Sequence, residues 1–156
     1  MAAWQAMTLM TVNQANSASE ERLGLGSNTA DLSLVAPWIE RLGSEHGVPA
    51  STQFAMNLCL EEVLSNIIRH GYGNKPGSSI VVRYSLTPDK SHLLVIDDEA
   101  PHFDPLTAEE SPVEDTLNGI RVGGLGLRLV KSFATNLQYE SKPIGNRLSI
   151  SFAPTA

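Results

Sequence analysis

The chain has 156 residues, of which 42% are hydrophobic and 18% charged, a composition typical of a globular protein with one core. Its formal charge of −6 argues against a nucleic-acid partner. No apolar run approaches the roughly 18 residues of a membrane span, so no membrane partner is expected. The N-terminus lacks the basic stretch of a signal peptide, and the single cysteine, Cys59, allows no internal disulfide. These features favour a cytoplasmic protein in which Cys59 packs rather than reacts.

The chain begins ambiguously and then shows a helical pattern. Residues 7–12 could form a strand, and residues 14–28 are polar and rich in turn formers. Apolar residues at helical spacing follow, which predicts a helix that begins at Asp31 and ends near Gly43 or Gly47.

Two prolines indicate where helices begin. Pro37 either kinks the first helix or lies in its true first turn. Pro49 precedes a second, longer helix, for which Ser51 is the expected N-cap. This helix ends at the glycine-rich residues 71–77. Its buried face is an apolar stripe made of Met56, Leu60, Val63, Leu64 and Ile67.

Strand patterns dominate the rest of the chain. Strands are expected at residues 79–86, 92–97, 136–141 and 147–152, with a helix at 125–134, a hairpin turn at 143–146 and a long loop at 106–122. This order predicts an α+β fold, a two-layer sandwich with helices on one face of a mostly antiparallel, mixed sheet. We expect one domain over residues 30–156, against which residues 1–29 pack as a strand and turn segment.

Glu62 and Asn66 form the first candidate site, because residues four positions apart share a helix face. They lie opposite the apolar stripe, in company with the small residues Ala55 and Cys59. An amide oxygen can ligate a hard cation such as Mg²⁺, and a carboxylate can accept a proton. The alternative is a solvated polar face on a surface helix.

The second candidate is the acidic end of the strand at 92–97. Asp97 and Asp98 precede a bend that contains proline. One carboxylate held there could accept a hydrogen bond from an exocyclic amine such as that of adenine. The alternative is an acidic turn with two solvated carboxylates.

Glycines before the helix at 125–134 form the third candidate. Where Gly123, Gly124 and Gly126 leave the backbone open, N–H groups can approach an anion, and a helix N-terminus favours negative charge. The segment is not a Walker A motif, because no Gly-Lys-Ser/Thr sequence follows. A tight loop would also explain these glycines.

In this order, the three candidates resemble the ATP-binding fold shared by sensor histidine kinases, type II topoisomerases, mismatch-repair ATPases and heat-shock chaperones. The segments EVLSNIIRHGY, GGLGLRLVKSF and GNRLSISF are most similar to those of the small bacterial anti-sigma-factor serine/threonine kinases. The resemblance covers residues 31–152 and implies the histidine-kinase-like ATPase fold, also called GHKL.

The resemblance implies a role for each matching residue. Glu62 would match the general base that acts on the incoming hydroxyl, Asn66 the Mg²⁺ ligand and Asp98 the acid that reads adenine. The segment 106–122 would be a lid. The other matching positions, all expected beside the nucleotide, are Ala100, Gly124, Gly126 and Ser149.

The implied cofactors are ATP and Mg²⁺. The implied reaction transfers the γ-phosphate to a serine of a STAS-type anti-sigma-factor antagonist. A sigma factor is a further implied partner. A homodimer is left open. Ala100 departs from the family, which usually has glycine there, and its methyl group would restrict the backbone and narrow the approach of the base. The alternatives are a non-catalytic partner-binding module that uses ATP as a conformational ligand, and a nucleotide-free interaction domain.

Overall fold

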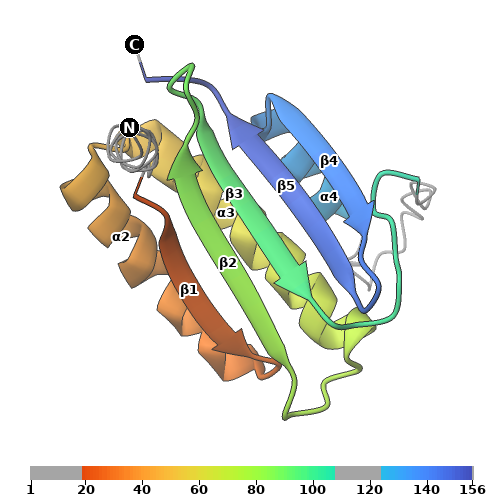
Figure 1. Ribbon diagram of the computed structural model, residues 1–156. Coiled ribbons are helices and arrows are strands. Elements are labelled where there is room, and N and C mark those ends of the chain that lie inside the picture. The colour runs from red at the N-terminus through yellow and green to blue at the C-terminus, as the bar shows by residue number, and fades with distance from the viewer. Residues whose placement is uncertain (1–18, 108–123, 156) are drawn as a thin grey trace, which may run out of the picture.

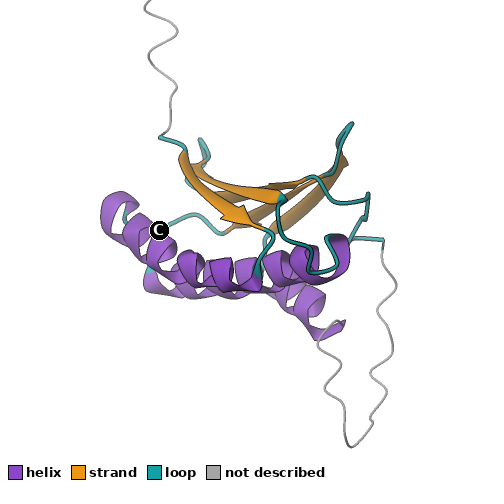
Figure 2. Ribbon diagram, turned by 90° about the horizontal axis from the view of Figure 1, so that it is seen from below, coloured by secondary structure: helices purple, strands orange, loops and turns teal. Residues whose placement is uncertain are grey.

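The structure is a computed structural model that describes residues 19–107 and 124–155. Its strands form one sheet (Figure 1), and the described helices all cover the same face of that sheet (Figure 2). None of these helices is both long and apolar enough to cross a membrane. In chain order the elements are β1 (Glu21–Gly26), the 3₁₀ helix η1 (Thr29–Leu34), α2 (Val35–His46), α3 (Ala50–Asn66), the π-helix η2 (Ile67–Gly71), β2 (Ser79–Leu86), β3 (His92–Asp98), α4 (Gly124–Phe133), β4 (Asn136–Ser141) and β5 (Asn146–Phe152).

The sheet has the strand order β1-β2-β3-β5-β4, and every neighbouring pair is antiparallel. Successive side chains alternate between its two faces. Ile80, Val82 and Tyr84 of β2 are buried under the helices, whereas Arg83 lies on the open face. The predicted two-layer α+β fold is confirmed, and the described strands are antiparallel throughout rather than mixed.

The two long helices bury the apolar faces that the sequence predicts. Leu42 of α2 and Leu60 of α3 are both fully buried. Pro37 lies in the first turn of α2, and α2 ends at His46, followed by the C-cap residue Gly47, which has a left-handed φ of 67°. The prediction for Ser51 is wrong: Pro49 is the N-cap of α3, so Ser51 lies inside the first turn.

Several element boundaries differ from the sequence prediction, and the helix expected from Asp31 is a 3₁₀ helix as far as Leu34, so that α2 begins at Val35. Strand β1 lies within residues 14–28, where turns were expected, and pairs along its whole length with β2. β3 ends one residue later, at Asp98, and β5 begins one residue earlier, at Asn146, so these two residues lie directly opposite each other. The strand expected at 7–12 and most of the loop expected at 106–122 lie outside the described residues.

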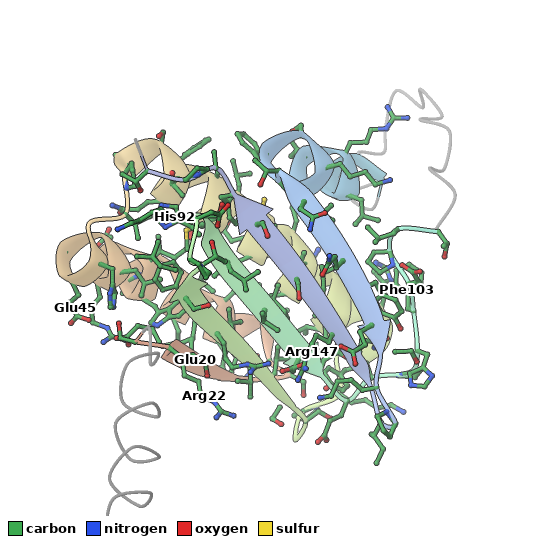
Figure 3. All side chains as sticks on the ribbon, turned by 45° about the horizontal axis from the view of Figure 1, so that its top comes forward. Glu20, Arg22, Glu45, His92, Phe103 and Arg147 are labelled. Atoms are coloured by element: carbon green, nitrogen blue, oxygen red, sulfur yellow. The ribbon has the colours of Figure 1, made fainter. Side chains whose placement is uncertain are left out.

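Asp97 lies at the centre of an ion-pair cluster on the open face of the sheet. Its carboxylate is 2.8 Å from Nη2 of Arg83, 2.7 Å from Nε of Arg147 and 3.6 Å from Nζ of Lys142. Arg147 is labelled in Figure 3. Burial alone would raise the pKa of Asp97, but the three cations outweigh it and hold that pKa below its usual value. The cluster therefore ties β2, β3 and β5 together on the side away from the helices.

Asp97→Asn is expected to lower the free energy of unfolding at pH 7 by on the order of 1 kcal/mol, because three cations lose their shared carboxylate. Since the pKa of Asp97 is lowered by folding, this stabilisation is present above the pKa of an unfolded aspartate and is lost as the pH falls through the lowered value. Urea unfolding at pH 7 and in acid measures both effects. An equal difference between wild type and variant at the two pH values would contradict the ionic explanation.

Candidate functional site

Three segments meet at one end of the sheet: the end of α3, the end of β3 and the beginning of β5 (Figure 1). α3 continues past Asn66 as η2, and a Cβ placed on Gly71, the last residue of η2, would lie 2.9 Å from the Cβ of Ala100. The hydroxyl of Tyr72 accepts a hydrogen bond of 2.7 Å from the backbone N–H of Glu99. π-helical turns occur often at functional sites, and this one connects α3 to the residues after β3.

Asp98 lies on the face covered by the helices and is 5% exposed. Its Oδ1 accepts hydrogen bonds from the backbone N–H of Ala100 at 2.8 Å and from Nδ2 of Asn146 at 2.9 Å. Within the described part of the chain, Oδ2 has no hydrogen-bond partner. Burial raises the pKa of Asp98, although the bonds from Asn146 and Ala100 oppose this shift. One carboxylate oxygen is thus held in place, while the other can accept a hydrogen bond from a ligand.

The two neighbouring aspartates differ because side chains of a strand alternate between its faces. Asp97 points to the open face and pairs with cations, whereas Asp98 points toward the helices. The alternative of two solvated carboxylates is therefore excluded, and Asp98 is the member of the pair that is available to a ligand on the helix side.

Asn146 is a residue of this site that the sequence analysis missed. It is 7% exposed, and its Nδ2 also donates to the carbonyl oxygens of Ala100 and Pro101. Its Oδ1 accepts hydrogen bonds from the backbone N–H of Phe103 and from the hydroxyl of Tyr139. The sequence pattern placed Asn146 in a turn. The alternation of side chains along a strand could have revealed it, because Asn146 lies on the same inward face as Leu148 and Ile150.

Gly145 brings Asn146 against β3. Its φ is 87°, and a Cβ there would overlap with the backbone carbonyl oxygen of Asp98. Both the left-handed backbone and the close approach require glycine. The turn between β4 and β5 is therefore built to place the Asn146 amide on the Asp98 carboxylate.

Asn146→Ala is expected to destabilise the fold by about 1–3 kcal/mol, because the buried Asp98 Oδ1 and the Tyr139 hydroxyl each lose a partner. The affinity for ATP, the ligand that the sequence resemblance implies, should fall as well, since Asp98 is no longer held in place. Thermal unfolding and calorimetric titration measure the two effects. An unchanged unfolding temperature would show that the amide does not organise the site.

Glu62 extends from α3 to the first turn of α4. Gly126, in that turn, is buried, and a Cβ on it would overlap with Oε2 of Glu62. α3 and α4 pack side by side (Figure 1). A carboxylate is favoured beside the N-terminal turn of a helix, and the backbone N–H groups of such a turn suit an anionic ligand. The structure thus brings together two candidates from distant parts of the sequence.

Asn66 follows Glu62 by one turn and ends α3. Both side chains are half-buried, and neither forms a hydrogen bond or an ion pair with the described residues. Free amide and carboxylate oxygens are ligands that suit Mg²⁺, which binds few protein groups and keeps several of its waters. The residues present therefore fit a magnesium ion bound on this face of α3.

Cys59 lies on α3 and is part of the hydrophobic core rather than of the candidate site. It is 1% exposed, and burial raises the pKa of its thiol to about 11. The thiol therefore stays protonated at neutral pH and is a poor nucleophile, as the sequence predicts.

The structure does not bring all of the remaining candidate residues to the helix side of the sheet. Ala100 is 4% exposed and does not have a left-handed backbone, so its methyl group packs near Gly71 without backbone strain. Gly124 begins α4, while Gly123 lies outside the described residues. Ser149 pairs with Val95 and lies on the open face, so the structure does not bring it to the side of the sheet that carries Asp98.

Comparison with known proteins finds a family model and a protein kinase that match most of this chain. A family model described as the histidine kinase-like ATPase domain matches residues 25–152. The serine/threonine-protein kinase BtrW of Bordetella bronchiseptica is 28% identical over 132 residues, which cover 80% of this chain and 92% of BtrW.

Two solved structures of a blue-light-activated histidine kinase from Erythrobacter litoralis are similar, each with a TM-score of 0.51. One is 19% identical and covers 79% of this chain, which spans 40% of that protein. The other, its histidine kinase domain, is 17% identical and covers 92% of this chain and 67% of the domain. At these identities the similarity shows the fold alone. Because the family model covers most of its length, the chain belongs to the histidine kinase-like ATPase domain family.

Proposed function

We propose that this chain is an ATP-dependent serine/threonine protein kinase that phosphorylates a serine of a STAS-type anti-sigma-factor antagonist. Membership of the ATPase family and similarity to a serine/threonine-protein kinase support an ATP-binding, kinase-like function. The observation that carries the proposal is the contact between Glu62 and the first turn of α4, with Asn66 one turn away on α3.

Each part of the nucleotide has a matching group in this proposal. The free Oδ2 of Asp98 accepts a hydrogen bond from the amine of adenine. The backbone N–H groups of the first turn of α4 face the phosphates. Asn66 would hold Mg²⁺, which would supply neutralisation of the phosphate charge.

The chemical step requires positioning more than covalent help from the protein. The serine oxygen forms a bond to the γ-phosphorus as the bond from that phosphorus to the bridging oxygen of ADP breaks. Glu62 accepts the proton of the serine hydroxyl. The products are phosphoserine and ADP. A sigma factor is a further proposed partner, bound when the antagonist is modified.

Transfer of radiolabelled γ-phosphate from ATP to purified STAS-type antagonist proteins tests this function. The expected result is acid-stable phosphoserine that depends on Mg²⁺ and on this protein. Tight ATP binding with no transfer to any antagonist would favour the non-catalytic module instead. Absence of ATP binding would leave only the nucleotide-free interaction domain.

A further inference from the structure

A hollow of about 380 Å³ lies between η1 and α3, next to Glu62. It takes most of its lining from one side of α3 and from η2, and the rest from η1. Its lining residues are Leu32, Ser33, Glu61, Glu62, Ser65 and Arg69.

The order of residues around α3 places Glu62 between this hollow and the magnesium-binding face. Successive residues of an α-helix are about 100° apart. Counted from Glu61, Ser65 therefore lies at about 40°, Glu62 at about 100° and Asn66 at about 140°. Ser65 lines the hollow, while Glu62 also borders Gly126 of α4. A hydroxyl that enters the hollow would thus meet the Glu62 carboxylate from the side away from Asn66.

Charge varies along the hollow. Glu61 and Glu62 lie at one end, and Arg69 lies about two turns further along the chain, on η2. Arg69 is exposed, and its guanidinium forms no ion pair with the described residues. The rise from Glu62 to Arg69 is roughly 10 Å, which an extended chain spans in about three residues.

We propose that this hollow binds the acceptor segment of the partner protein. The segment lies extended along α3, with its serine hydroxyl at Glu62 and an acidic side chain about three residues away at Arg69. Glu61 disfavours an acid directly beside the serine, so the two charged ends of the hollow select both the register and the sequence of the acceptor. This inference rests on the proposed kinase function and names Arg69 as a residue that determines specificity.

Arg69→Glu tests the proposal in steady-state phosphorylation of a STAS-type antagonist. The expected result is a KM for the antagonist raised by at least about tenfold, as for loss of one charged contact, with kcat and ATP affinity unchanged. Arg69→Gln should raise KM by less. The matched control is Arg22→Glu, which makes the same charge change on the exposed, opposite face of the sheet and should leave KM unchanged. Circular dichroism verifies that each variant is folded.

A charge swap completes the test. Replacing the acidic residue about three positions from the acceptor serine with lysine should restore a low KM for Arg69→Glu and raise KM for wild type. If wild type phosphorylates the antagonist and Arg69→Glu does so with an unchanged KM, the hollow is not the acceptor site and the kinase function stands. If wild type phosphorylates no antagonist, the kinase function and this inference both fail.

Discussion

Glu62→Gln is expected to slow phosphoryl transfer by about 10²–10⁴-fold, the usual contribution of a general base, while ATP affinity stays close to that of wild type. The amide has the same shape as the carboxylate but cannot accept the proton of the incoming hydroxyl. The contact with the first turn of α4 should persist, because glutamine occupies nearly the same volume. The expected result is therefore a loss in kcat rather than in binding.

Single-turnover transfer from radiolabelled ATP, with ATP affinity measured in parallel by calorimetry, separates these two quantities. Glu40→Gln is a suitable control, because Glu40 is exposed on α2 and does not line the hollow beside α3. Transfer by Glu62→Gln at the wild-type rate would show that Glu62 is not the base. A loss of ATP affinity that equals the loss of rate would show that Glu62 acts in binding instead.

Asp98→Asn is expected to weaken ATP binding by about 10–100-fold, which corresponds to about 1–3 kcal/mol for a buried polar mismatch. In the wild type, Oδ1 is already occupied by Ala100 and Asn146, so the free Oδ2 is the acceptor for the amine of adenine. The variant keeps one oxygen for those two donors but presents an N–H₂ group to another donor. For the same reason, wild type should bind ATP better than GTP, which has a carbonyl in place of the amine.

The fold should tolerate Asp98→Asn. Because burial raises the pKa of Asp98, the folded state binds its proton more tightly than the unfolded state does. The stabilisation that protonated Asp98 gives the folded state is therefore present below the pKa of an unfolded aspartate. It is lost as the pH rises through the raised pKa of folded Asp98. At neutral pH the variant should be at least as stable as wild type. Equal affinity of wild type for ATP and GTP, or an ATP affinity unchanged in Asp98→Asn, would remove Asp98 from the base-binding site.

The layered fold was predictable because local pattern and tertiary packing agree. The apolar stripe that includes Leu60 and Leu64 repeats at helical spacing, and these residues are fully buried in α3. Strand β1 was missed because its two glycines, Gly24 and Gly26, make it look like a turn. Only its pairing with β2 stabilises it as a strand, and the local sequence does not contain that information.

The site was predictable where one element defines it and not where two elements must be placed in register. Glu62 and Asn66 share one helix, so their spacing alone puts them on one face. The partnership of Asp98 with Asn146 depends on the alignment of β3 with β5, which no single segment determines. Ser149 shows the same difficulty, because a shift of one residue moves a side chain to the other face of a sheet.

Hydrogen exchange of the backbone amides, measured by mass spectrometry with and without ATP and Mg²⁺, tests most directly whether the nucleotide binds along α3 and η2, between Ala100 and the first turn of α4. Slower exchange in the presence of ATP is expected at η2, at residues 98–103 and in the first turn of α4. Strand β1, at the far edge of the sheet, should exchange at the same rate in both samples and serves as the internal control. Protection that is absent from those three segments, or that appears instead on β1, would contradict the assignment of the site.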